Sequence, residues 1–207
     1  MIKYLIKFVS KLEYAKMLQN GRFFMRPLSY YRCLEEGQGD VLEGAISHSI
    51  FMFKNTQWPI CCFYSVDDFD VISNGNIKID KRCIDDFKCK DGYIVIINFS
   101  EFEKMLPTID TEGYQLSAGK VSYRNIVFEE LADLMKKETL DNVFIKRLKY
   151  SYQKEYRIVI TKNISSGKDH ITYEMSSDIK SISNVIAVST LKTNDEGYLV
   201  LPKEMLL

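Results

Sequence analysis

The sequence has no excess of charge of either sign. Its 28 lysine and arginine residues balance 28 aspartate and glutamate residues, so the formal net charge is zero. A domain that binds nucleic acid through bulk positive charge usually has a strong basic excess, and disordered chains combine low hydrophobicity with a charge imbalance. The 46% of apolar residues is instead typical of a packed globular protein. The composition therefore argues against nucleic-acid binding by the whole surface and leaves open binding by a local basic patch.

The sequence also lacks long hydrophobic runs. No apolar stretch approaches the roughly 18 residues that a membrane-spanning helix needs. Residues 1–8 alternate polar and apolar side chains and contain no apolar segment typical of a signal peptide. We therefore expect a cytoplasmic protein with no membrane partner. At about 150 residues per domain, the 207 residues and the absence of an evident linker predict a single domain over 1–207.

Metal ligands and phosphate-binding loops are scarce. There are two histidines and five cysteines, and no Cys-x-x-Cys spacing occurs, so we expect no zinc site and no other metal. The acidic run 67–70 carries ligands for a hard cation, but we interpret it as a solvated loop. Cys61 and Cys62 are interpreted as reduced residues of a buried strand. No dinucleotide-binding or Walker A glycine pattern is present.

Many short β-rich segments alternate irregularly with a few helical ones. Capping boxes at Ser10–Glu13 and Ser100–Glu103 predict two helix starts, and Asn20-Gly21 predicts the end of the first helix. The fold class that follows is α+β, with a mixed or antiparallel β core and flanking helices. Strands are predicted at 1–8, 22–26, 46–53, 59–65, 93–99, 121–123, 156–161, 171–175, 185–189 and 198–201, a loop at 35–44, and an amphipathic helix at 127–135.

The most informative segment lies immediately before the predicted strand at 156–161. Gln153 and Glu155 are two residues apart, so an extended chain points both side chains to one face, and Arg157 continues that face. Such groups are rarely buried in a strand unless they are paired. A solvated edge strand, with Glu155 paired to a lysine, is the structural alternative.

The Gln-x-Glu segment resembles the carboxyl-terminal signature of ADP-ribosyltransferases. The resemblance implies a split, twisted β core, NAD as a substrate, Glu155 as the catalytic carboxylate and Gln153 as the guide for the acceptor. A glutamine at this position resembles members that modify amide or base nitrogens. The usual Ser-Thr-Ser strand motif is absent, with Phe63-Tyr64-Ser65 in its place.

Weaker matches to the same superfamily suggest how NAD is held. The resemblance implies that Arg26 binds the pyrophosphate by a bidentate contact, that Ser65 braces Glu155 or the ribose, and that Tyr30 or Tyr31 stacks on nicotinamide. Arg157 is placed with these cofactor-binding residues. The structural alternatives are a surface arginine, a serine at a strand end and core tyrosines.

A basic and aromatic segment directly precedes Gln153. Lys146, Lys149 and Tyr152 interleave cations with a ring, and a basic pair stands at 136–137. Such interleaving suits single-stranded nucleic acid, so these residues are candidates for binding an RNA or single-stranded DNA substrate. A solvated helical face is the alternative interpretation.

A second resemblance covers nearly the whole chain. The opening pattern over 14–44, together with Lys146, Tyr150, Gln153, Glu155 and Arg157, resembles a family of uncharacterised proteins of bacterial mobile elements and phages. This resemblance implies a role as a toxin, a defence effector or a counter-defence factor, with an antitoxin or another antagonist protein as a partner.

These patterns predict an NAD-dependent ADP-ribosyltransferase that modifies a nucleic-acid base. Two other hypotheses remain. The first is a non-catalytic module that binds a nucleotide or a protein, as a phage counter-defence factor would. The second is an NAD glycohydrolase that uses water as the acceptor.

Overall fold

The protein is a mixed α+β structure in which almost all strand pairs are antiparallel. The computed structural model describes residues 1–32, 34, 57–107, 113–125, 140–164 and 168–206. The helices are α1 (Leu12–Gln19), α2 (Leu28–Arg32), α3 (Lys81–Asp86) and α4 (Phe99–Met105). The strands are β1 (Ile2–Val9), β2 (Arg22–Pro27), β3 (Pro59–Asp67), β4 (Ile77–Asp80), β5 (Tyr93–Asn98), β6 (Leu116–Lys120), β7 (Ser122–Arg124), β8 (Ile145–Arg147), β9 (Glu155–Ile160), β10 (Ile171–Glu174), β11 (Ser183–Ala187), β12 (Lys192–Thr193) and β13 (Tyr198–Leu201).

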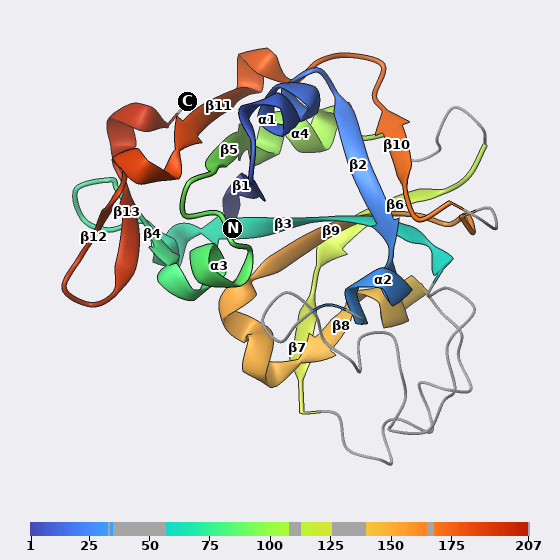
Figure 1. Ribbon diagram of the computed structural model, residues 1–207, viewed down its shortest axis with the longest axis horizontal. Helices are drawn as coiled ribbons and strands as arrows, with labels where there is room; N and C mark the ends of the chain where they lie inside the picture. Colours follow the sequence, from blue (N-terminus) through green and yellow to red (C-terminus); the bar gives the residue numbers. More distant parts are fainter. Residues whose placement is uncertain (33, 35–56, 108–112, 126–139, 165–167, 207) are drawn as a thin grey trace.

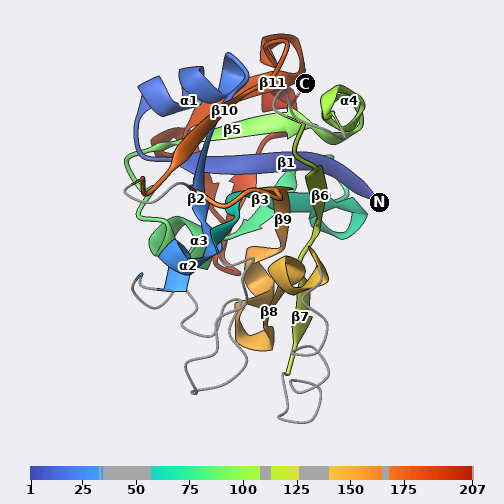
Figure 2. The ribbon, with the colours of Figure 1, turned by 90° about the vertical axis from the view of Figure 1, so that its right-hand side faces the viewer.

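The main sheet divides into two branches along β3. At one end of β3, Tyr64 pairs with Ile6 of β1, and at the other end Ile60 pairs with Arg26 of β2. β5 and β11 continue the β1 branch, and β10 continues the β2 branch. The opposite edge of β3 pairs with β9, which in turn pairs with β6. Figures 1 and 2 show β1 and β2 diverging from β3, so the sheet is forked.

Apolar side chains cover both faces of the β1 branch. Helices α1 and α4 lie on one face, where Ala15, Leu18 and Phe102 pack against β1, β2, β3 and β5. Helix α3 and the small sheet β12-β13-β4 contribute to a second cluster on the other face. Strands covered on both sides are continuously apolar, and residues 94–97 of β5 are all fully buried. The buried strand predicted at 93–99 is therefore confirmed.

Both predicted capping boxes are wrong. Helix α1 begins after Lys11, which makes no side-chain cap, so Ser10 is not the capping residue. Helix α4 begins after Asn98, whose side chain accepts the Glu101 backbone N–H, so the cap lies two residues before Ser100. An asparagine carboxamide caps as well as a serine hydroxyl, and it starts the helix immediately where β5 ends.

Several other sequence expectations have definite outcomes. The predicted strands at 1–8, 22–26, 59–65 and 156–161 correspond to β1, β2, β3 and β9. The acidic run 67–70 forms a capped 3₁₀ turn rather than an open loop. The predicted loop at 35–44, strand at 46–53, helix at 127–135 and basic pair at 136–137 lie outside the described residues.

Candidate active site around Glu155

Glu155 is the first residue of β9, a central strand rather than an edge strand. β9 is bordered by β3 and β6, and all six of its residues are buried. Its alternation places Glu155 and Arg157 on the same face of the sheet, as the sequence predicts for an extended segment. The solvated edge-strand alternative is therefore wrong, although its expectation of a lysine partner is met.

Two cations hold the Glu155 carboxylate. The Lys146 Nζ lies 2.5 Å from Oε1, and the Arg157 guanidinium donates to Oε2 from Nε at 2.8 Å and from a terminal nitrogen at 2.7 Å. Relative exposures are 5% for Glu155, 3% for Lys146 and 0% for Arg157. Arg157 also donates to the Val143 carbonyl at 2.5 Å. This is a desolvated, charge-assisted network.

The carboxylate is ionised at neutral pH. Burial alone would raise the pKa of Glu155, but the charges of Arg157 and Lys146 outweigh burial and lower the pKa from 4.5 to about 2. A carboxylate has about four lone-pair positions, and Lys146 is the only donor recorded on Oε1 among the described residues. Oε1 thus has the capacity to accept a further hydrogen bond.

Gln153 joins this network through its amide group. Its Oε1 accepts a hydrogen bond from Lys146 at 2.8 Å, and its Nε2 donates to Asp86 at 3.2 Å. The Tyr152 hydroxyl also donates to the same Asp86 oxygen. Burial, together with this bond to Asp86, raises the pKa of Tyr152. Lys146 therefore links the predicted acceptor guide to the predicted catalytic carboxylate.

A left-handed residue sets the geometry between Gln153 and Glu155. Lys154 has φ 41° and ψ 45°, so the chain turns sharply between the 3₁₀ segment that ends at Gln153 and strand β9. Its ammonium group pairs with Asp70 at 2.5 Å. The Lys154 carbonyl accepts hydrogen bonds from Ser65, at 2.9 Å from N and 2.8 Å from Oγ. A conformation that is unfavourable for a lysine is thus held by three contacts.

Ser65 supports the backbone next to Glu155 rather than its side chain. Tyr64 pairs with Glu155 in the β3–β9 register, so Ser65 points to the opposite face of the sheet from the carboxylate. Its hydroxyl bonds the Lys154 carbonyl. In this structure Ser65 braces the turn before Glu155, and it does not line the same face as the carboxylate.

Arg26, Tyr30 and Tyr31 form a second cluster, as the sequence suggests. The Arg26 guanidinium carbon lies 3.8 Å from the Tyr30 ring centroid, and the rings of Tyr30 and Tyr31 meet edge to face at 5.6 Å. Arg26 pairs with Ile60 in the β2–β3 register, and Ile60 pairs with Val159.

The two clusters share one sheet face but are not in contact. Val159 is four residues from Glu155, which is about 13 Å along a strand. An apolar group formed by Leu28, Ile60, Val143 and Val159 packs on that face, and Tyr31 lies against it.

The residues predicted to bind nucleic acid differ in their exposure to solvent. Lys146 is buried in the Glu155 network, and Tyr152 is half-buried with its hydroxyl on Asp86. Lys149 is exposed, with its Nζ 4.9 Å from the Tyr150 ring centroid. Of the three, only Lys149 presents its charge to solvent.

Two residues of the site were missed in the sequence. Asp86 ends helix α3 and accepts from both Tyr152 and Gln153, and the Tyr123 hydroxyl accepts the Glu155 backbone N–H at 2.8 Å. Burial, followed by the charge of Glu155, raises the pKa of Tyr123. No local sequence signal connects either residue to Gln153 and Glu155, because both contacts join segments that are distant in the chain.

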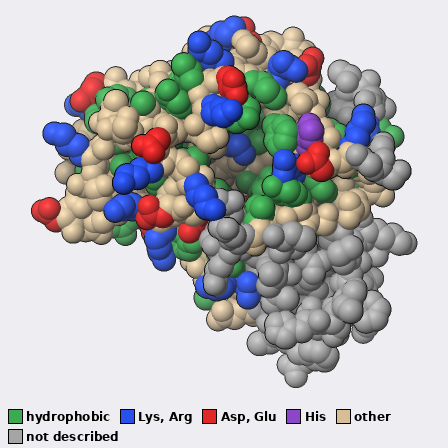
Figure 3. Space-filling model, viewed as in Figure 1, with side chains coloured by type: hydrophobic (Ala, Val, Ile, Leu, Met, Phe, Trp, Pro, Cys, Tyr) green, Lys and Arg blue, Asp and Glu red, His purple; other side chains and the backbone are tan. Residues whose placement is uncertain are grey.

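A hollow lies over the fork of the sheet, between β1 and β2 (Figure 3). Near the fork the Lys7 Nζ donates to the Cys62 carbonyl at 2.7 Å and lies 5.4 Å from the Phe63 ring centroid. Cys62 lies between the part of β3 that pairs with β1 and the part that pairs with β2, and Lys7 bonds its carbonyl there.

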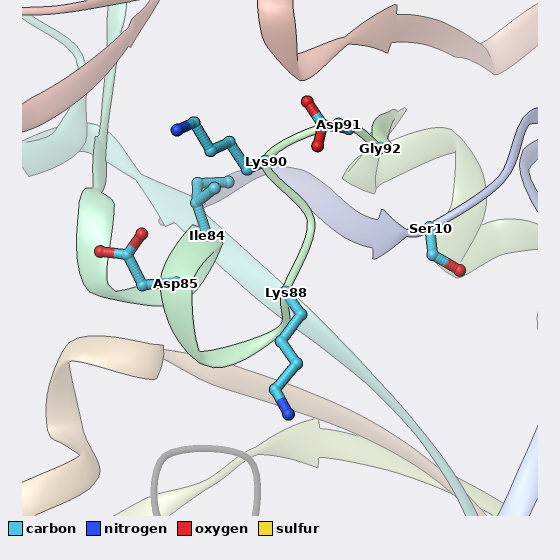
Figure 4. A pocket seen from close by; sticks show the side chains of 7 residues that line it. All are labelled: Ser10, Ile84, Asp85, Lys88, Lys90, Asp91 and Gly92. Atoms are coloured by element: carbon cyan, nitrogen blue, oxygen red, sulfur yellow. The ribbon is translucent and has the colours of Figure 1, made fainter.

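A separate pocket of about 350 Å³ lies beside the loop that follows α3 (Figure 4). Its two lysines and two aspartates balance in charge, and the side chains of Asp85, Lys88 and Lys90 point in different directions. The pocket therefore selects no charge class of ligand. It is lined by Ser10, Ile84, Asp85, Lys88, Lys90, Asp91 and Gly92.

Comparisons with protein-family models, with curated proteins and with solved structures give no match for this chain. In the part of the chain that the structure describes, no helix has the length and apolar character needed to cross a membrane.

Proposed function

We propose that the chain is an NAD-dependent ADP-ribosyltransferase that modifies a nucleic-acid base, as a toxin or defence effector. The observation that carries the proposal is the ionised Glu155 carboxylate, held beside Gln153 by their common partner Lys146. Buried ionic networks cost stability relative to apolar packing, and strongly perturbed titrating groups concentrate at functional sites. The forked sheet also fits the split β core that the resemblance implies.

The proposed reaction breaks the bond between nicotinamide and ribose. The bonding electrons leave with nicotinamide, and positive charge develops on the ribose. A preorganised carboxylate stabilises such charge more effectively in a dry site than in water. The lone pair of a base nitrogen then forms the new bond to the ribose carbon, and that nitrogen loses its proton. Glu155 supplies the carboxylate and the Gln153 amide positions the base.

The other predicted residues have roles in binding NAD. Arg26 binds the pyrophosphate, with Tyr30 and Tyr31 providing rings for the nicotinamide. Arg157 fixes the orientation of the carboxylate by holding Oε2, so the reactive edge is Oε1, which accepts a hydrogen bond from Lys146 and has capacity for one more. The proposal requires this edge to open when NAD binds, since Glu155 is 5% exposed.

The test uses NAD labelled in its adenylate half, incubated with the protein and with RNA, DNA and protein acceptors. We expect label on nucleic acid with the wild type and none with Glu155→Gln. Gln153→Ala retains both Glu155 ion pairs, so we expect it to release nicotinamide but to lose label transfer. Glu101→Gln, in an exposed pair on α4, is the matched control. Free ADP-ribose without labelled acceptor would identify a glycohydrolase instead.

The second candidate is a non-catalytic module that binds a nucleotide or a protein. It is favoured by the neutralisation of Glu155, because two buried cations offset the carboxylate and both oxygens are occupied. On this hypothesis the network is a structural element. A folded wild type that consumes no NAD under any acceptor condition would support this candidate and contradict the transferase.

A further inference from the structure

The outer face of β2 alternates cations with an aromatic ring. Phe23 and Met25 point into the core, so Arg22, Phe24 and Arg26 share the other face. Phe24 is 42% exposed, which is unusual for a phenylalanine in the middle of a strand. An exposed ring between two arginines points to a ligand that has a flat π system as well as negative charges.

The Phe24 ring is already stacked on one side. The His170 ring, one residue before the neighbouring strand β10, lies 4.6 Å from the Phe24 ring at an interplanar angle of 28°. Figure 3 shows a histidine on this face among hydrophobic, basic and acidic side chains. The two rings stack face to face, and the Arg26 guanidinium carbon lies 5.3 Å from the Phe24 ring centroid. We call this stacked pair of rings the platform.

The carboxylate partners of the two arginines are exposed, although Arg26 itself packs over the Tyr30 and Phe24 rings. Arg26 approaches Asp169 at 3.5 Å, and its buried Nε has no hydrogen-bond partner among the described residues. Arg22 pairs with Glu174 at 2.9 Å, but both side chains are more than half exposed. Exposed ion pairs contribute little to stability, so a phosphate can replace Glu174 on Arg22 at small cost. The Arg26–Asp169 contact is long, at 3.5 Å, and Asp169 is exposed.

We propose that this face of β2 binds single-stranded nucleic acid, with one base stacked on the Phe24–His170 platform and phosphates on Arg22 and Arg26. The proposal deepens the proposed function, on which it rests for its biological meaning, by naming the acceptor surface. The two arginines are four residues apart, about 13 Å along the strand. Two cations this far apart, on either side of a ring, fit two phosphates of one polymer strand, whereas a mononucleotide has no second phosphate to reach the far arginine.

The platform leads toward the Glu155 network. Arg26 pairs across β3 with the same face of β9 that carries Arg157 and Glu155. A nucleic-acid strand that lies along β2 therefore reaches this face of β9 at the Arg26 end of β2. Duplexes are excluded because their bases are already stacked on one another, whereas an unpaired base presents its face to an aromatic ring.

The test is fluorescence anisotropy of a labelled, mixed-sequence single-stranded RNA with the full chain, in the absence of NAD. We expect Phe24→Ala to weaken binding about tenfold, the loss of one base stack, and Phe24→Tyr to retain it. Arg22→Ala should reduce the slope of log K against log salt by about 0.7, the loss of one phosphate contact.

The controls separate this surface from the rest of the molecule. Phe69→Ala removes another exposed ring, and Lys104→Ala removes an exposed cation of α4, and both should bind as the wild type does. Equal binding by wild type and Phe24→Ala, or equal binding of the duplex, would overturn the proposal. Because no NAD turnover is measured, this result is independent of the proposed reaction.

Discussion

At the residue scale, the central feature is a buried carboxylate shared by two cations. Burying charges is expensive, and removing one partner of a buried ion pair is more costly than the pair itself is worth. The Gln-x-Glu-x-Arg spacing predicts that Glu155 and Arg157 share a face, and they do. The sequence predicts Lys146 as a substrate-binding residue and misses its burial. That burial depends on the contact between Lys146 of β8 and Glu155 of β9, which the local sequence does not specify.

Glu155→Gln should destabilise the fold by about 3 kcal/mol, because it leaves two buried cations without their counter-charge. The measurement is the free energy of unfolding in urea at neutral pH. Glu101→Gln, which breaks the exposed pair with Lys104, should cost about 0.5 kcal/mol or less. Similar small costs for both variants would contradict the buried network.

The same carboxylate predicts a defined dependence of stability on pH. The folded-state pKa of Glu155 is lowered from 4.5 to about 2, so its contribution is fully present above about pH 5 and is lost as the pH falls toward 2. The size of this contribution is about 3 kcal/mol. The difference in unfolding free energy between wild type and Glu155→Gln should therefore shrink over this range. A difference that is constant with pH would contradict the ion pairs.

At the element scale, close contacts and turns decide where the site residues point. The continuous apolar run at 93–99 is sufficient to predict β5, because both faces of that strand are covered. The capping box at Ser100 failed because Asn98, which ends β5, caps the helix first, whereas α1 begins after Lys11 without a side-chain cap. The left-handed Lys154 has no sequence signal, since glycine is the usual residue in that conformation.

Lys154 offers a test of the turn before β9. Lys154→Ala removes the ion pair with Asp70 and keeps the left-handed backbone. Lys154→Gly removes the same pair but relieves the backbone strain, so it should be more stable than the alanine variant by about 1 kcal/mol. Chemical denaturation of the two variants measures this difference. A glycine variant that is the less stable of the two would show that the turn is not strained.

Gly21 tests the junction between α1 and the β2–β10 pair. It has φ 76°, and a Cβ there would lie 2.6 Å from the Ser177 carbonyl oxygen. Gly197 has φ 82° but no atom within 4 Å of such a Cβ. Gly21→Ala should therefore cost at least about 1 kcal/mol more than Gly197→Ala, because only the first adds a clash to the backbone strain. Equal melting temperatures would contradict the close approach.

At the scale of the whole molecule, the α+β class follows from the sequence but the forked sheet does not. The pairing of β3 with β9 joins Tyr64 to Glu155, and the pairing of β2 with β10 joins Phe24 to Thr172. Register between such distant segments depends on the packing of both faces. The sequence therefore predicts Gln153, Glu155 and Arg157 as one group, whereas the contacts of Asp86 and Tyr123 and the separation of the two clusters depend on the topology.

The zero net charge limits how the whole molecule can bind nucleic acid. Several described acidic and basic groups pair with one another, including Lys154 with Asp70 and Arg26 with Asp169. Any nucleic-acid contact must then be local, with a few phosphates and a stacked base rather than a long electrostatic footprint. The outer face of β2 has this character.

The most direct test of the central claim is the release of nicotinamide from NAD by the purified full chain, measured with and without single-stranded RNA. We expect release that increases when RNA is added, because an acceptor base is needed to complete the transfer. A folded protein that releases no nicotinamide under either condition would contradict the proposed transferase and leave Glu155 as a structural residue.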